Sequence, residues 1–163
     1  MPEISLFGWF HTIVAILALI SGFYTLAKFK VIRLAQATGK AYLVLTLIAA
    51  ASALGIYKHG GFGAAHALAV LTILAVLVGA IAEKKRLFGG LSQYVQAFSY
   101  SATFLFHMIP AITDFLLRLP ADAPFVTEFN DPLLQGFHLA FLVAFLIGFA
   151  LQVAWLRKKT GPQ

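Results

Sequence analysis

The chain contains no cysteine among its 163 residues. This absence excludes disulfide bonds, iron–sulfur clusters, thiolate metal sites and cysteine nucleophiles, so any metal must be bound through nitrogen or oxygen. Charged residues are also scarce, at 11%, where soluble domains have about 25%. Hydrophobic residues make up 61%. This composition predicts an integral membrane protein, with one compact transmembrane domain over residues 1–163.

The signatures of several enzyme classes are missing as well. The sequence has no phosphate-binding glycine loop, no dinucleotide fingerprint and no paired-histidine motif of the desaturase type. The first lysine is Lys28, so the N-terminal run lacks the basic start of a cleavable signal peptide and we expect it to be retained. The net charge of +6 comes from short loops between apolar runs, which is typical of membrane topology rather than nucleic-acid binding.

Five apolar segments approach the roughly 20 residues that a helix needs to cross a bilayer. They cover residues 5–27, 41–57, 64–83, 94–118 and 132–156, and the second is the shortest. Glycine and proline breaks separate them. We interpret the last break, over residues 120–132, as either an interfacial lid or an ordinary loop. The sequence therefore predicts an all-α membrane bundle of five transmembrane helices.

Basic residues are concentrated in the loops on one side of this predicted bundle. They are Lys28, Lys30, Arg33, Lys40, Lys84, Lys85, Arg86, Arg157, Lys158 and Lys159. The acids Glu3, Asp122, Glu128 and Asp131 fall on the other side. By the positive-inside rule we expect a cytoplasmic C-terminus and an N-terminus outside, in a bacterial inner membrane.

Four of the five histidines lie one per predicted span, toward the outer face: His11, His66, His107 and His138. Ionisable residues inside a bilayer are costly, and they mark functional sites by default. For a single histidine, interhelical hydrogen bonding explains the residue equally well. Four histidines on four spans suggest that they converge on a ligand.

Haem b is the first ligand that this pattern suggests, because neutral imidazoles from two helices of a bundle commonly bind it. Gly8 and Gly63 each precede a histidine by one helical turn and leave room for a flat macrocycle. With His11, His66, His107 and His138 as candidate axial ligands, we expect a small b-type cytochrome or haem-bearing subunit. It would exchange electrons with quinone or a partner at the outer, periplasmic face.

A non-haem metal site is the main alternative. His11, His66, His138 and Asp114 lie at similar predicted depths and can bind zinc, copper or iron, with His107 as a further ligand or support. An ion pair competes for Asp114, because Arg118 follows it at the favourable i, i+4 spacing.

A third interpretation is a structural accessory subunit whose histidines only pack. The small residues 49–53 and Gly55 favour helix packing in a homo-oligomer or a larger membrane complex. We also considered a proton relay, because histidine titrates near neutral pH. Apart from Gln96, Gln152, tyrosines and hydroxyls, the inner half of the spans offers little to a relay. We therefore do not expect proton pumping.

The histidine of the first span, the loop that ends Gly39-Lys40-Ala41-Tyr42 and the start Gly63-Ala-Ala-His66 form a pattern. It resembles the bacterial membrane proteins grouped as domain-of-unknown-function family 2306, over roughly residues 8 to 110. Gly39 and Tyr42 match the family's His-Arg-x-x-Gly-x-x-Tyr loop, whereas Ala35 stands at its histidine. The resemblance implies the multi-span architecture. A looser similarity to b-type (b561-like) membrane cytochromes implies a haem bundle.

Overall fold

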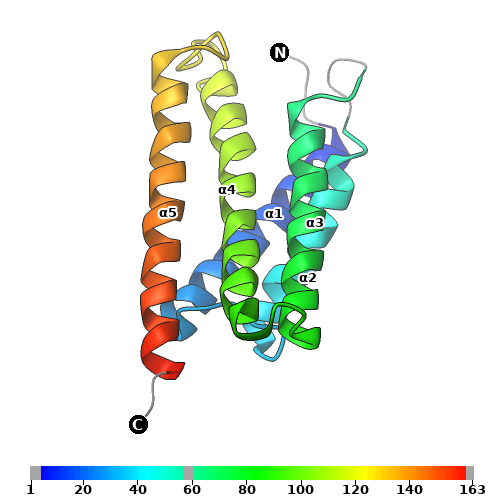
Figure 1. Cartoon of the computed structure of the whole chain (residues 1–163). Coiled ribbons are helices and arrows are strands. Elements are labelled where there is room, and N and C mark those ends of the chain that lie inside the picture. The colour runs from blue at the N-terminus through cyan, green and yellow to red at the C-terminus, as the bar shows by residue number, and fades with distance from the viewer. Residues whose placement is uncertain (1–4, 57–60, 161–163) are drawn as a thin grey trace.

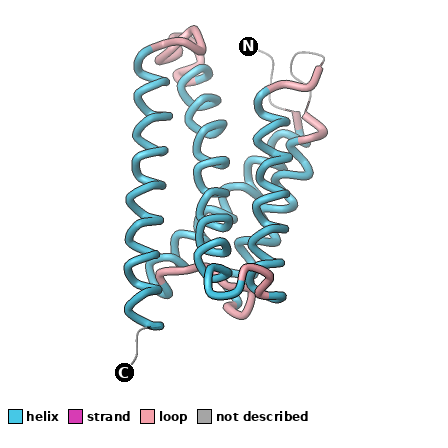
Figure 2. Tube along the Cα trace, viewed as in Figure 1, coloured by secondary structure: helices cyan, strands magenta, loops and turns pink. Residues whose placement is uncertain are grey.

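A computed structural model of the protein describes residues 5–56 and 61–160, apart from the side chain of Thr160. The described part is helical and contains no strand (Figure 2). Its elements are α1 (Leu6–Phe29), α2 (Ala37–Ala53), α3 (Ala64–Lys85), the short 3-10 turn η1 (Gly89–Leu91), α4 (Ser92–Arg118) and α5 (Pro132–Thr160). The prediction of an all-α helical bundle is confirmed.

Four helices, α1, α3, α4 and α5, are long and apolar enough to cross a membrane. At about 1.5 Å per residue, the 17 residues of α2 cover about 26 Å, slightly less than the roughly 30 Å of a hydrocarbon core. Five crossings and the orientation of the termini stay predictions. Glu3 lies outside the described residues, as do Lys58 and the fifth histidine of the chain, His59.

Successive helices run in alternating directions and pack as neighbours in chain order, from α1 beside α2 to α4 beside α5 (Figure 1). A lighter contact joins α1 to α4. We name the end where α1, α3 and α5 terminate the basic end, because their last turns hold Lys28, Lys84–Lys85 and Arg157–Lys159. The opposite end is named the histidine end.

Two tyrosines fill the centre of the bundle, and each lies against a glycine of another helix. Tyr42 and Tyr100 are fully buried. A Cβ atom at Gly22 would lie 2.6 Å from Tyr42 Cδ2, and one at Gly79 would lie 2.6 Å from Tyr100 Cδ1. Glycine is therefore needed at both positions to admit the rings, and the ring–glycine contacts fix how the helices pack against one another.

The connector between α1 and α2, residues 30–36, is enclosed at the basic end. It begins at Lys30, whose φ of 68° ends α1, and it buries Val31 and Ile32. Side chains of three other helices bind its backbone at alternating residues. Gln152 Nε2 of α5 donates to Lys30 O (3.0 Å), Gln96 Nε2 of α4 donates to Ile32 O (2.8 Å), and Leu34 N donates to both carboxylate oxygens of Glu83 of α3 (2.9 and 3.0 Å).

The loop between α4 and α5 folds back over the histidine end of these two helices. Val126 N donates to Leu116 O at 3.1 Å, and the Val126 side chain is buried with Leu116 and Leu134. Phe125 and Phe129 remain exposed. The loop therefore forms a packed cap on the α4–α5 pair.

The helix boundaries differ from the predicted spans mainly at α2. This helix begins at Ala37 and ends at Ala53, whereas the apolar run predicted residues 41–57. Its first turn is polar, and Thr25 Oγ1 of α1 donates to Thr38 Oγ1 there at 2.8 Å. Tertiary hydrogen bonding thus starts the helix before its apolar run starts.

The substitution Gly79→Ala tests the ring–glycine packing. We expect it to lower the free energy of unfolding by about 1–3 kcal/mol, the usual cost of overpacking a core, because the new methyl group meets the Tyr100 ring. Thermal unfolding in detergent measures the change. Gly136→Ala is the matched control, since a Cβ there has no other group within 4 Å. Equal unfolding temperatures for the two variants would contradict the packing.

Candidate functional site

His11 connects α1 to α2 near the histidine end. Its Nδ1 lies 3.0 Å from Ala49 O and 3.0 Å from Ser52 Oγ. Because a carbonyl oxygen can only accept, Nδ1 carries a hydrogen, and the basic nitrogen of the neutral ring is Nε2. This orientation suits a histidine that accepts a proton or a ligand through Nε2.

His107 connects α4 to α2 closer to the middle of the bundle. Its Nε2 lies 3.3 Å from Thr46 Oγ1, and its ring lies within electrostatic range of His11. These two histidines therefore occupy the same region, between α1, α2 and α4.

The other two histidines lie elsewhere. His66 Nδ1 accepts a hydrogen bond from Gly63 N at 3.1 Å, so this residue caps the start of its own helix. His138 Nε2 lies 2.9 Å from Thr113 Oγ1. Thr113 donates its own hydroxyl hydrogen to Ile109 O at 2.7 Å, so His138 is the donor and its Nε2 is protonated.

The predicted ligands are therefore spread over several places. Within residues 5–56 and 61–160, no three His, Asp or Glu side chains converge as a metal site requires. Asp114 forms the ion pair with Arg118, with Nε and Oδ2 2.9 Å apart. The metal set of His11, His66, His107, His138 and Asp114 stays a prediction that this arrangement does not favour.

Within the described packing, neither the centre of the bundle nor its cavity between α1, α4 and α5 provides a haem site lined by these histidines. The centre of the bundle is filled by Tyr42, Tyr100 and Phe104, and the rings of Tyr42 and Phe104 stack with centroids 4.7 Å apart. A cavity of about 570 Å³ lies between α1, α4 and α5, and no histidine lines it. The haem hypothesis stays a prediction.

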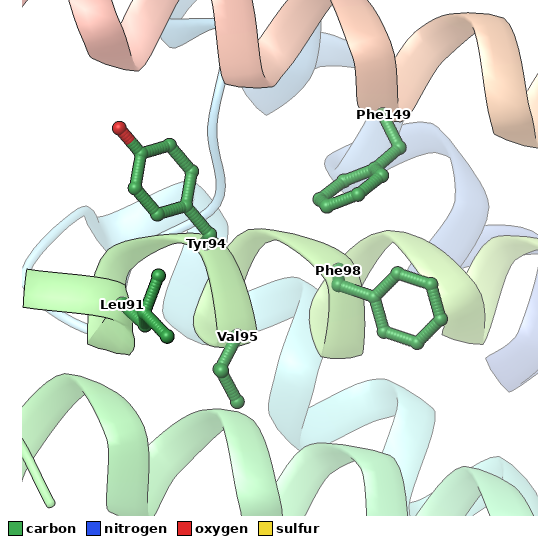
Figure 3. Close-up of a pocket in the computed structure, with 5 residues that line it drawn as sticks. All are labelled: Leu91, Tyr94, Val95, Phe98 and Phe149. Carbon is green, nitrogen blue, oxygen red and sulfur yellow. The ribbon is translucent and has the colours of Figure 1, made fainter. Parts of the chain in front are cut away.

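A second hollow, of about 280 Å³, lies between α4 and α5 near the basic end. Figure 3 shows its lining residues Leu91, Tyr94, Val95 and Phe98 of η1 and α4, with Phe149 of α5 facing them. Phe98 and Phe149 meet edge to face at 5.2 Å. The Tyr94 hydroxyl is the single polar side-chain group in this lining, so the hollow offers no catalytic set.

Hydroxyl groups continue from His107 into the middle of the bundle. Thr46, which lies beside His107 Nε2, also interacts with the hydroxyl of Tyr42 one turn earlier on α2. The Tyr42 hydroxyl is hydrogen-bonded to Thr103 Oγ1 of α4. Thr46, Tyr42 and Thr103 are each fully buried.

A carboxylate completes the series toward the basic end. The Tyr100 hydroxyl donates to Glu83 Oε2 at 3.2 Å. Tyr100 lies in the same buried cluster as Tyr42, and Glu83 is half-buried near the end of α3. The series therefore extends from the histidine end to the basic end. We name it the central polar chain: His11, His107, Thr46, Tyr42, Thr103, Tyr100 and Glu83.

The expectation that only Gln96, Gln152, tyrosines and hydroxyls could serve a relay in the predicted inner half of the spans omitted Glu83, which lies near the basic end of α3 and is hydrogen-bonded to Tyr100. Glu83 was not among the predicted site residues; it stands at the end of a predicted span, beside Lys84, Lys85 and Arg86. A signal was present in the sequence. Glu83 follows Gly79 by one helical turn, and the two residues share the face of α3 that meets Tyr100.

Comparison of the chain with known protein families, characterised proteins and solved structures finds no match. The resemblance to family 2306 and the looser similarity to b-type cytochromes stay predictions.

An absorption spectrum of the purified protein tests the haem hypothesis. Because tyrosine and phenylalanine rings close the bundle centre, we expect no Soret band and no change in the α-band region on dithionite reduction. A Soret band that is lost in both His11→Leu and His107→Leu, with folding retained, would overturn this expectation and restore the haem-carrier hypothesis.

Proposed function

We propose that this chain is an integral membrane protein that transfers protons along the central polar chain. The observation that carries the proposal is the series of titratable and hydroxyl side chains through the apolar bundle, which are hydrogen-bonded to one another in separate segments. Intramembrane series of His and acidic side chains are typical of proton pathways. Apolar packing alone would not require polar groups at these central positions.

Burial along the chain supports transfer from one end to the other. His11 and His107 are half-buried at one end, and Glu83 is half-buried at the other. Between them, Thr46, Tyr42 and Thr103 are fully buried. Water reaches the ends more easily than the middle, so a proton crosses the middle through side chains.

Each type of side chain has its own role in the proton transfer. The imidazoles of His11 and His107 transfer a proton at the histidine end, because a histidine ring can bind a proton at one nitrogen and release it from the other. Thr46, Tyr42 and Thr103 each accept one proton and release another through their hydroxyl groups. The Glu83 carboxylate accepts the proton from Tyr100 and releases it at the basic end. One proton enters for each proton that leaves.

The path of hydrogen bonds is interrupted between the hydroxyl groups of Tyr42 and Tyr100. Thr103 donates its hydroxyl hydrogen to the backbone carbonyl of Tyr100 at 2.7 Å, which leads away from the Tyr100 hydroxyl. Transfer between the two tyrosines requires a water molecule or a reorientation of a ring at this point. The central polar chain therefore transfers a proton only when this gap between the two tyrosines is bridged.

In this proposal, the distribution of charged residues gives the orientation of the protein in the membrane. The basic residues are at the end that holds Glu83, and the positive-inside rule places such an end in the cytoplasm. The protein would then be a multi-pass protein of a bacterial inner membrane, with the histidine end facing outward.

Proton flux into vesicles tests the function. The purified protein is reconstituted into liposomes that contain a pH-sensitive dye, and a potassium diffusion potential drives the flux. We expect flux above that of protein-free liposomes, and loss of this flux in Tyr42→Phe, Tyr100→Phe and Glu83→Gln. Each substitution removes a proton-transferring group and keeps the shape of the side chain.

Tyr94→Phe is the matched control, because it deletes a tyrosine hydroxyl in the hollow of Figure 3, away from the chain. It should leave the flux unchanged. Loss of one interhelical hydrogen bond costs about 0.6 kcal/mol, so the three tyrosine variants should unfold at similar temperatures. Glu83→Gln keeps one carbonyl oxygen for Leu34 N, and its unfolding temperature is measured beside its flux. Flux that is absent from the wild type, or equal in all variants, would favour a structural accessory subunit.

A further inference from the structure

The cavity between α1, α4 and α5 lies apart from the central polar chain. α4 forms its floor with Ser101, Phe104 and Met108, while α1 and α5 form its two walls. Its volume of about 570 Å³ lies within the range of about 300–1,000 Å³ that is usual for ligand sites. Most of its lining is aromatic or aliphatic, as an acyl chain requires.

Two of the residues that α5 contributes to the cavity wall are small. Ala144 and Gly148 line the cavity one turn apart. A Cβ at Gly148 would have no other group within 4 Å, so the space beside this glycine is not closed by the helix packing. α1 and α5 make few direct contacts, which leaves the cavity open along the side of the bundle.

Cationic groups surround the mouth of the cavity at the basic end. The exposed Lys30 lines it, and Lys159 Nζ lies 4.5 Å from the centroid of the Trp155 ring, which also lines it. Among the described acids, Glu83 alone lies at this end, and it is hydrogen-bonded to Leu34 N and Tyr100. The mouth is therefore positively charged.

We propose that this cavity binds an anionic phospholipid, with one acyl chain along α4 and the phosphate between Lys30 and Lys159. Basic pockets between membrane helices are known recognition sites for anionic headgroups. An uncharged quinone is less well matched, because the polar floor is already paired. Ser101 Oγ donates to Gln152 Oε1 at 2.8 Å, and Gln152 Nε2 donates to Lys30 O at 3.0 Å.

Two glycine substitutions on α5 test whether the phospholipid binds in this cavity or elsewhere along the helix. Gly148→Phe places a ring in the cavity, whereas Gly136→Phe places one in open space outside the cavity lining. Thermal unfolding in detergent is measured with added phosphatidylglycerol, phosphatidylcholine or ubiquinone, and native mass spectrometry detects the retained molecule. We expect phosphatidylglycerol to raise the unfolding temperature most for wild type and for Gly136→Phe, with no such rise for Gly148→Phe.

The double variant Lys30→Gln with Lys159→Gln tests the headgroup contact. It should still retain phospholipid but lose the preference for phosphatidylglycerol over phosphatidylcholine. Three results would overturn the proposal: an equal response of both glycine variants, a larger stabilisation by ubiquinone than by phosphatidylglycerol, or a change of oligomeric state as the sole effect of Gly148→Phe. The last result would identify a second copy of the chain as the occupant.

Discussion

The arrangement of the five helices depends on how the connector between α1 and α2 is held. Its backbone groups at residues 30, 32 and 34 are bound by side chains of α5, α4 and α3 in turn. Backbone groups buried away from water must find partners, because leaving them unpaired is costly. The three side chains therefore fix the connector and the register of three helices together.

The helical architecture follows from the sequence because long apolar runs and glycine or proline breaks leave few alternatives in a membrane. The family-like positions Gly39 and Tyr42 have physical roles in the fold. A Cβ at Gly39 would lie 2.5 Å from Arg33 O, and Tyr42 fills the bundle centre. The start of α2 was less predictable, since the Thr25–Thr38 hydrogen bond depends on how two helices meet.

The candidate site was predicted only in part. Histidine is rare in apolar runs, so His11 and His107 could be predicted as site residues from the sequence. Their partners, Ala49, Ser52 and Thr46, belong to α2, which contains no histidine and attracted attention only for its small residues. Hydroxyl side chains are common in membrane helices, and periodicity does not indicate which of them face an imidazole. Convergence depends on the rotation of each helix about its axis, which hydropathy does not determine.

Chain order and spatial order largely coincide in this bundle, since each helix packs against the next. Each pair can thus form soon after synthesis, when its second helix enters the membrane. The connector is the exception. Its carbonyl at Lys30 is bound by Gln152, 122 residues later. The connector is therefore synthesised before α3, α4 and α5, but its hydrogen bonds are all formed only after α5 has been inserted.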